Sequence, residues 1–203
     1  MPSLNWIGKE AVEHHHRDVP YRLVHCDDSL SAGDPNAGNL LVQGDNLEAL
    51  KALLPYYAGQ VKCIYIDPPY NTGNEKWRYN DNNNAPDIKR WLGEVVGKEA
   101  DDLSRHDKWL CMMYPRLRLL RDFLSEDGVL FASIDHNELA NFQLLLAETF
   151  NGYQQIAIPV VNNMKGRNDR DYIATCHEYI VLVAKASFVS NGLPLSQQQR
   201  ARF

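Results

Sequence analysis

The sequence predicts an α/β fold in which a parallel sheet carries an antiparallel pair of strands at one edge. Two observations lead to this prediction. Short apolar runs rich in β-branched residues alternate with longer segments in which apolar side chains recur at helical spacing. Near the carboxyl end, the apolar runs 155–161 and 178–185 follow each other with no helix-length apolar segment between them. Neighbours of that kind pair most simply as antiparallel strands.

The first elements are expected to be a strand, a helix and a second strand. The run 39–43 (NLLVQ) predicts the first strand, which a Gly-Asp turn ends. Leucines at helical spacing then predict a helix that stops at Pro55. The run 61–66 (VKCIYI) predicts the second strand, because it is rich in β-branched and aromatic residues.

The later elements repeat the alternation. An apolar stripe from Trp109 to Leu124 predicts an amphipathic helix, whose arginines are expected to be solvated. The run 129–134 predicts the next strand. Asp135 is expected to cap the following helix, with Glu138 completing a capping box.

Three regions are expected along the chain. Residues 1–38 are polar and read as an irregular arm, on which His14–His16 are solvated and do not converge on a metal. Residues 39–188 form the folded domain, which includes a long polar loop between Asn71 and Asp107. Residues 189–203 read as a polar tail.

Composition excludes several classes of protein. No stretch is long and apolar enough for a membrane span, and the amino terminus does not resemble a signal peptide, so a soluble cytoplasmic protein is expected. The four cysteines form no C-x-x-C pair, which argues against zinc and disulfides. The net charge of -5 argues against a protein that coats nucleic acid indiscriminately. The segment after 152 is nevertheless net positive and is the more plausible face for DNA.

The sharpest local signal is the motif Asp67–Tyr70 (DPPY), which lies directly after a predicted strand. Two prolines make a rigid turn there, and a carboxylate and an aromatic ring flank them. The Asp67 carboxylate and the Pro68 carbonyl are candidate acceptors for the hydrogens of an exocyclic amine. The Tyr70 ring offers a face for a flipped-out base. A purely structural proline turn is the alternative interpretation of the motif.

The motif and its neighbours resemble a known family. The segments GDNLEAL (44–50), DPPYNTGN (67–74), YPRLRL (114–119) and SIDHNE (133–138) are similar to the adenine-specific DNA methyltransferases of type III restriction-modification systems. The likeness extends from Leu4 to about Lys185. It implies a partial Rossmann-like, S-adenosylmethionine-dependent methyltransferase fold, DNA as the substrate, self-association and an ATP-dependent restriction subunit as a partner.

The resemblance also assigns roles to residues. The family's motif binds the target adenine, which carries over to Asp67 and Tyr70, and Asp45 would lie near the adenosine of S-adenosylmethionine. A helix N-cap is the alternative explanation of Asp45, and both roles can coexist. The full expected set comprises the catalytic residues Asp67, Pro68, Pro69 and Tyr70, the pocket residues Asn71, Thr72, Gly73 and Asn74, and the cofactor residues Asp45 and Asn46, with no metal.

The sequence departs from the family in one respect. None of the twelve glycines has the G-x-G spacing of the family's F-x-G-x-G cofactor loop. We therefore expect the chain to be the amino-terminal part of a longer protein or half of a split enzyme, with a second polypeptide supplying that loop. The family's sheet order also predicts that the outer edge of the 61–66 strand lacks a neighbour here.

Three other functions remain open. The first is methylation of the N4 amine of cytosine, because the same acceptors and ring suit any exocyclic amine. A non-catalytic DNA-binding remnant would also retain this part of the fold. A methyltransferase of proteins or small molecules usually carries Asn at the first position of the motif, so Asp67 counts against it.

Overall fold

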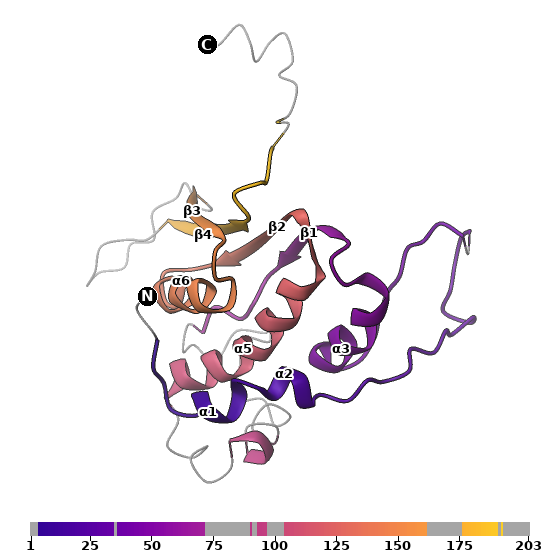
Figure 1. The fold of residues 1–203 in the computed structure, drawn as a ribbon, viewed down its shortest axis with the longest axis horizontal. Coiled ribbons are helices and arrows are strands. Elements are labelled where there is room, and N and C mark those ends of the chain that lie inside the picture. The colour runs from indigo at the N-terminus through magenta and orange to yellow at the C-terminus, as the bar shows by residue number, and fades with distance from the viewer. Residues whose placement is uncertain are drawn as a thin grey trace, which may run out of the picture.

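The structure is a computed structural model, and it describes residues 4–34, 36–71, 90, 93–96, 104–161, 176–190 and 192. The named elements in chain order are α1 (Lys9–Val12), α2 (His15–Asp18), α3 (Asn46–Tyr57), β1 (Val61–Ile66), α5 (Arg105–Phe123), β2 (Leu124–Ile134), α6 (Leu139–Thr149), β3 (Gln154–Val161) and β4 (His177–Ala184). Figure 1 shows α3, α5 and α6 beside one sheet, with α1 and α2 next to α5.

The described strands form a four-stranded sheet in the order β1-β2-β4-β3. Strands β1 and β2 run parallel, whereas β4 runs antiparallel to both β2 and β3. The predicted antiparallel pair at one edge is confirmed. The parallel part is smaller than expected, because only one of the three described pairings is parallel.

A bulge marks the start of the β1–β2 pairing. The register shifts between Val61 and Cys63, which lie opposite Leu124 and Val129 respectively. Gly128 sits inside this bulge, where an added Cβ would come within 2.8 Å of the Val61 carbonyl oxygen. The strand β2 therefore begins earlier than predicted, because a residue without a side chain lets the two backbones approach closely.

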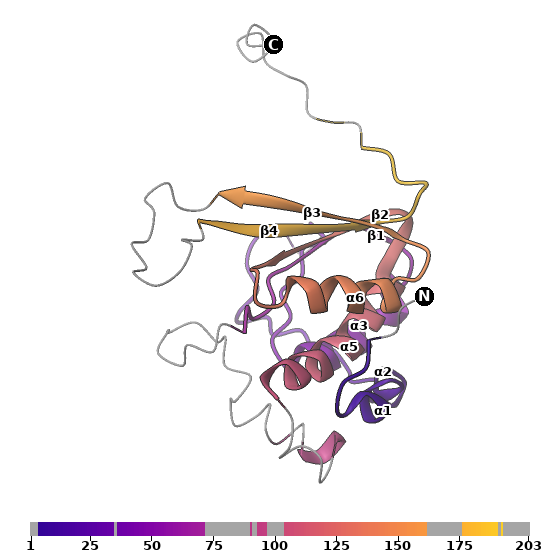
Figure 2. The same ribbon diagram turned by 90° about the vertical axis from the view of Figure 1, so that its left-hand side faces the viewer.

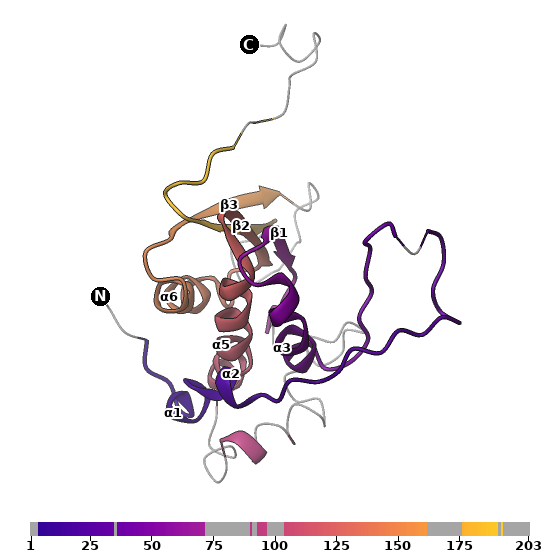
Figure 3. The same ribbon diagram turned by 45° about the vertical axis from the view of Figure 1, so that its right-hand side comes forward.

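The helices of the described chain cover one face of the sheet. Figure 2 shows the helices on one side of the four strands, and Figure 3 shows α5 between α3 and α6. The opposite face carries exposed apolar side chains, among them Tyr65 (61 % exposed), Ile156 (57 %) and Ile158 (44 %). The described part of the fold is thus a two-layer arrangement with one open sheet face.

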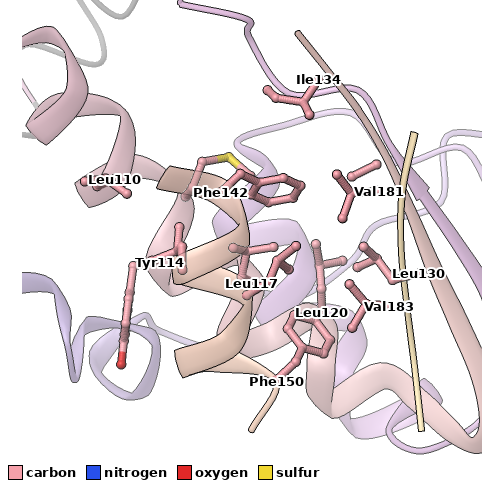
Figure 4. Packing of buried hydrophobic residues seen from close by; sticks show 14 of the residues in the cluster. Leu110, Tyr114, Leu117, Leu120, Leu130, Ile134, Phe142, Phe150, Val181 and Val183 are labelled. Carbon is pink, nitrogen blue, oxygen red and sulfur yellow. The ribbon is translucent and has the colours of Figure 1, made fainter. Parts of the chain in front are cut away.

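The core lies between α5, α6 and the covered sheet face. Figure 4 shows Leu117 and Leu120 from α5 facing Leu130 and Val183 from the sheet, with Phe142 of α6 closing the cluster. These five side chains are at most 8 % exposed. Because α5 is buried along much of its length, it is the central support of the domain.

The predicted strand 39–43 is not present. These residues have no regular secondary structure, and Leu40 and Leu41 are 55 % and 97 % exposed. In the described part of the chain no strand pairs with the outer edge of β1. A strand requires a partner for its backbone groups, so an apolar run that has none stays irregular.

The helix α3 is longer than predicted. It was expected to stop at Pro55, but it continues through this proline to Tyr57.

The amino-terminal segment was predicted to be an irregular arm, and this prediction is wrong for residues 9–18. They form α1 and α2, which pack against α5 through Val12 and Val19. His16 is buried rather than solvated, and its burial lowers the pKa of the imidazole to about 4, with nearby Arg118 adding to the effect. The Lys51 ammonium ties this segment to α3 by donating to the His16 carbonyl at 2.9 Å.

In the ranges that the structure describes, no helix combines the length and the apolar character that crossing a membrane requires.

Candidate active site at the carboxyl end of β1

The motif Asp67–Tyr70 lies where β1 ends, at the edge of the sheet that also holds the end of β2 and the start of β4. Asp67 is exposed, whereas Pro68 is buried and Pro69 and Tyr70 are partly buried. The carboxylate therefore faces solvent while the two prolines hold the turn against the domain. Ligands of open α/β sheets bind at this kind of edge.

The Pro69 carbonyl is fixed by the long helix below it. The indole N–H of Trp109 in α5 donates to the Pro69 oxygen at 2.7 Å. Trp109 is fully buried and packs edge-on against Phe142 of α6, with the ring centroids 5.7 Å apart. The turn is thus attached to the core by a hydrogen bond whose donor cannot move freely.

The Tyr70 side chain reaches across the sheet edge. Its hydroxyl donates to Oε2 of Glu178, the second residue of β4, at 3.2 Å. Burial raises the pKa of Tyr70 from its ordinary value, and the carboxylates of Asp67 and Glu178 raise it further. The phenol therefore stays neutral at physiological pH, and its hydroxyl remains a donor to Glu178.

The residue after the motif adopts an unusual backbone conformation. Asn71 has φ of 55°, in the left-handed region that asparagine tolerates better than most residues. It is 4 % exposed, and its side-chain amide donates to the Arg105 carbonyl at 3.2 Å and to Oε1 of Glu138. The expected pocket residues Thr72, Gly73 and Asn74 lie outside the described residues.

The Glu138 side chain does not have the predicted role. The predicted capping box at α6 is wrong, because the helix begins at Leu139 without a side-chain cap. Asp135 instead accepts from the backbone N–H of Asn137 at 2.8 Å. The Glu138 carboxylate points into the interior, where Asn71 and His106 donate to it, so it cannot fold back on its own helix.

The second predicted segment lies at the start of α3. Asp45 is the N-cap, and its Oδ1 accepts from the backbone N–H groups of Leu47 at 2.9 Å and Glu48 at 3.1 Å. The other carboxylate oxygen lies 3.8 Å from Arg116 of α5. The N-cap interpretation of Asp45 is therefore confirmed, and its side chain remains 56 % exposed toward solvent.

Like Trp109 and Glu178, Arg116 is a residue of the candidate site that the sequence did not reveal. It was expected to be solvated, yet its side chain is 16 % exposed, and its Nε donates to Oδ1 of Asn46 at 2.6 Å. Burial lowers the pKa of this guanidinium from its ordinary value, while Asp45 opposes the change. Helical spacing alone placed Arg116 outward, because nothing in the sequence shows that α3 begins beside it.

The two segments share one support. Trp109 holds the Pro69 carbonyl, and Arg116 holds Asn46. These two α5 residues are seven positions apart, which is two turns along the same side of the helix or roughly 10 Å. The structure thus brings the segments of Asp45 and Asp67, 22 positions apart in sequence, to one side of a single helix.

Comparisons with known proteins show the family of the chain. Residues 61–201 match the family model N6_N4_Mtase, which is described as DNA methylase. The chain belongs to this family.

Among its relatives, the chain is 39 % identical over 197 residues to the Mod subunit of the type III restriction-modification enzyme EcoPI from Escherichia phage P1. It is 37 % identical over 196 residues to the Mod subunit of EcoP15I from Escherichia coli. Each match covers 90 % of this chain and 30 % of the relative, so the chain spans about a third of the length of these relatives. A crystal structure of an M1.HpyAVI-SAM complex aligns with a TM-score of 0.44 and 17 % identity, over 77 % of this chain and 60 % of that one.

Proposed function

We propose that the protein takes part in transferring a methyl group from S-adenosylmethionine to the N6 amine of adenine in DNA. The observation that carries the proposal is the rigid turn at the end of β1, on which an exposed Asp67 carboxylate stands beside the anchored Tyr70 ring. Family membership and the similarity to Mod subunits support it.

The adenine amine is a poor nucleophile, because its lone pair is delocalised into the ring. Asp67 would accept one amino hydrogen, and the Pro68 carbonyl would accept the other. Both contacts favour a more tetrahedral and more nucleophilic nitrogen. The Pro69 carbonyl is already bonded to Trp109 and holds the turn, so the Pro68 carbonyl is the one left to bind the amine.

Tyr70 would stack on the flipped-out base and offset part of the few kcal/mol that unstacking costs. Its hydroxyl is bonded to Glu178, which fixes the ring at the edge of the sheet. Because burial and the two neighbouring carboxylates raise the pKa of Tyr70, the ring stays uncharged beside Asp67. Asn71 would support the ring from behind, and Thr72, Gly73 and Asn74 would form the lip of the pocket.

One of the two expected cofactor residues, Asp45, suits S-adenosylmethionine. S-adenosylmethionine carries hydroxyl and ammonium donors, and the outward Asp45 carboxylate is an acceptor that suits either of them. Asn46 fits less well, because its Oδ1 already accepts from Arg116. When bound, the cofactor supplies an electrophilic methyl group. We expect a second polypeptide segment with the F-x-G-x-G loop to complete this half of the site.

Asp67→Ala tests the proposal. Methyl transfer from labelled S-adenosylmethionine to unmethylated DNA should fall by roughly 10²-fold or more, because an amine acceptor is lost. DNA affinity should be nearly unchanged. Asp34→Ala, at an exposed aspartate of the amino-terminal segment, is the matched control. Retained transfer by Asp67→Ala would exclude the assigned role.

The assay also separates the alternatives. N6-methyladenine in the product DNA supports the proposal, whereas N4-methylcytosine would reveal the cytosine enzyme. Transfer that appears only when a polypeptide with the cofactor loop is added would identify half of a split enzyme. Silence under both conditions would favour a non-catalytic remnant. A restriction subunit as a partner and a cytoplasmic location, both expected from the sequence, belong to the same proposal.

A further inference from the structure

The carboxylate of Glu138 is completely buried beneath the DPPY turn. A buried charge is costly unless it is fully hydrogen-bonded. Three side chains provide these bonds: Asn71 and His106 donate to Oε1, the latter at 2.6 Å, and Asn141 donates to Oε2 at 2.8 Å. Both oxygens of the carboxylate are therefore engaged within a compact polar cluster.

The members of this cluster come from separate parts of the chain. Asn71 follows the DPPY motif, His106 lies in the first turn of α5, and Glu138 and Asn141 belong to the start of α6. The bond between Asn71 and Glu138 spans 67 positions in sequence. The cluster thus fixes the end of the motif to two helices at once.

The position of Asn71 gives this contact its importance. Asn71 is the residue directly after Tyr70 and stands in a left-handed conformation that its side-chain bonds hold in place. Its peptide carries the Tyr70 carbonyl, so the orientation of Asn71 sets the direction in which the chain leaves the ring. Loss of its anchor would let the ring and the turn move together.

We propose that Glu138 is a positioning residue that holds the base-binding turn in its working geometry through Asn71. The inference rests on the proposed function in one respect, namely that Tyr70 is the ring against which the base stacks. Glu138 itself touches neither the base nor the cofactor. It acts by keeping Asp67 and Tyr70 in the arrangement that the chemistry needs before DNA arrives.

Two substitutions of Asn71 separate the side-chain bond from the backbone conformation. Asn71→Gly removes the bond to Glu138 but tolerates a positive φ, whereas Asn71→Ala removes the bond and also strains the backbone. Both variants should lower kcat for methyl transfer by roughly 10²-fold, the cost of a small misplacement at a reacting centre. KM for DNA should change little, because Asn71 is 4 % exposed and its side chain is bonded to buried Glu138. Loss of activity in Asn71→Ala alone would overturn the proposal.

Trp109 reports on the turn independently of activity. Its indole N–H donates to Pro69, so the hydrogen-exchange rate of that one proton measures how often the turn opens. In Glu138→Ala and in Asn71→Gly, exchange at Trp109 should accelerate by roughly tenfold to a hundredfold, the factors expected for losing a hydrogen bond to a charged group. Exchange at the wild-type rate in Asn71→Gly would overturn the proposal.

The double variant provides the decisive comparison. If Glu138 acts through Asn71, then the double variant Glu138→Ala with Asn71→Gly should exchange no faster, and turn over no more slowly, than the more affected of the two single variants. Effects that add independently would overturn the proposal. Glu148→Gln is the matched control, since Glu148 lies on the same helix but pairs with Lys9 at 2.8 Å. It should change neither readout.

This design keeps the two proposals distinguishable. If the wild-type protein methylates no DNA under any condition, the proposed function fails, but the exchange of the Trp109 proton still decides whether Glu138 holds the turn. If methylation is normal in Asn71→Gly, the positioning role fails while the proposed function stands.

Discussion

The turn after β1 and the turn before α3 both rest on α5, yet they are held in different ways. Trp109, Glu138 and Glu178 hold the first turn from α5, the start of α6 and β4. The second turn is held by the cap of its own helix and by Arg116. The side proposed to bind the base is therefore held by long-range contacts, whereas the side proposed to bind the cofactor depends mainly on local ones.

The difference has a physical meaning for catalysis. A turn that must activate a weak nucleophile needs its groups fixed before the substrate binds. A carboxylate that accepts from a flexible cofactor can stand exposed and adjust to it. Substitutions should accordingly affect the two turns to different degrees, and the first turn should be the more sensitive of the two.

Trp109→Phe should have the largest effect. It removes the bond to Pro69 and leaves a partly empty space in the core, which together should lower the free energy of unfolding by roughly 2–4 kcal/mol. Methyl transfer per folded molecule should fall by roughly 10²-fold, because the turn loses its support. Urea unfolding and steady-state kinetics measure the two effects. Phe150→Leu, at a core ring 1 % exposed, should lower stability without this loss of activity. An equal loss in both variants would show that the turn needs only an intact core.

Substitutions at Asp45 should have an intermediate effect and separate its two roles. Asp45→Asn keeps the helix cap but loses the charge, so stability should change little while affinity for S-adenosylmethionine falls. Asp45→Ala should lose about 1 kcal/mol of stability in addition. Calorimetric titration with the cofactor and urea unfolding measure these quantities. Unchanged cofactor affinity in Asp45→Asn would leave Asp45 with the cap alone.

Tyr70→Phe should have the smallest effect at neutral pH. Removing the hydroxyl loses one hydrogen bond to Glu178, worth about 0.5–1.5 kcal/mol, but keeps the ring. At high pH, the Tyr70 hydroxyl is instead expected to lower the stability of the wild type relative to Tyr70→Phe. The raised pKa of Tyr70 means that the folded protein retains a proton which the unfolded chain loses above pH of about 10.

Above that pH, the stability of the wild type should therefore fall relative to Tyr70→Phe, by at most about 1.4 kcal/mol for each further pH unit. Unfolding of both proteins at pH 8 and at a pH above 10 tests this sign. A difference that does not depend on pH would mean that Tyr70 titrates normally in the folded protein.

The sequence predicted the elements whose pattern is local. The strand β1 was predicted with its observed bounds, and the stripe of apolar residues located α5, because burial of one face leaves a periodic trace. The antiparallel pair of β3 and β4 followed from the missing crossover helix. The DPPY turn was placed correctly for the same reason, since paired prolines end a strand wherever they occur.

What the sequence did not predict depends on distant partners. The run 39–43 has the composition of a strand but finds no neighbour in the described chain. Glu138 has the spacing of a capping residue, yet its carboxylate is buried and accepts a hydrogen bond from Asn71, 67 positions earlier. Arg116 also depends on a distant partner. Its guanidinium contacts Asn46 of the candidate site only because α3 packs on α5.

The separation between Asn71 and Glu138 also bears on the order in which the protein is made. Asn71 leaves the ribosome 67 residues before the carboxylate that holds it. At roughly 5–20 residues per second, the DPPY turn stays without this support for several seconds. The turn can therefore acquire the observed geometry only after the start of α6 has been synthesised, long after the DPPY motif itself.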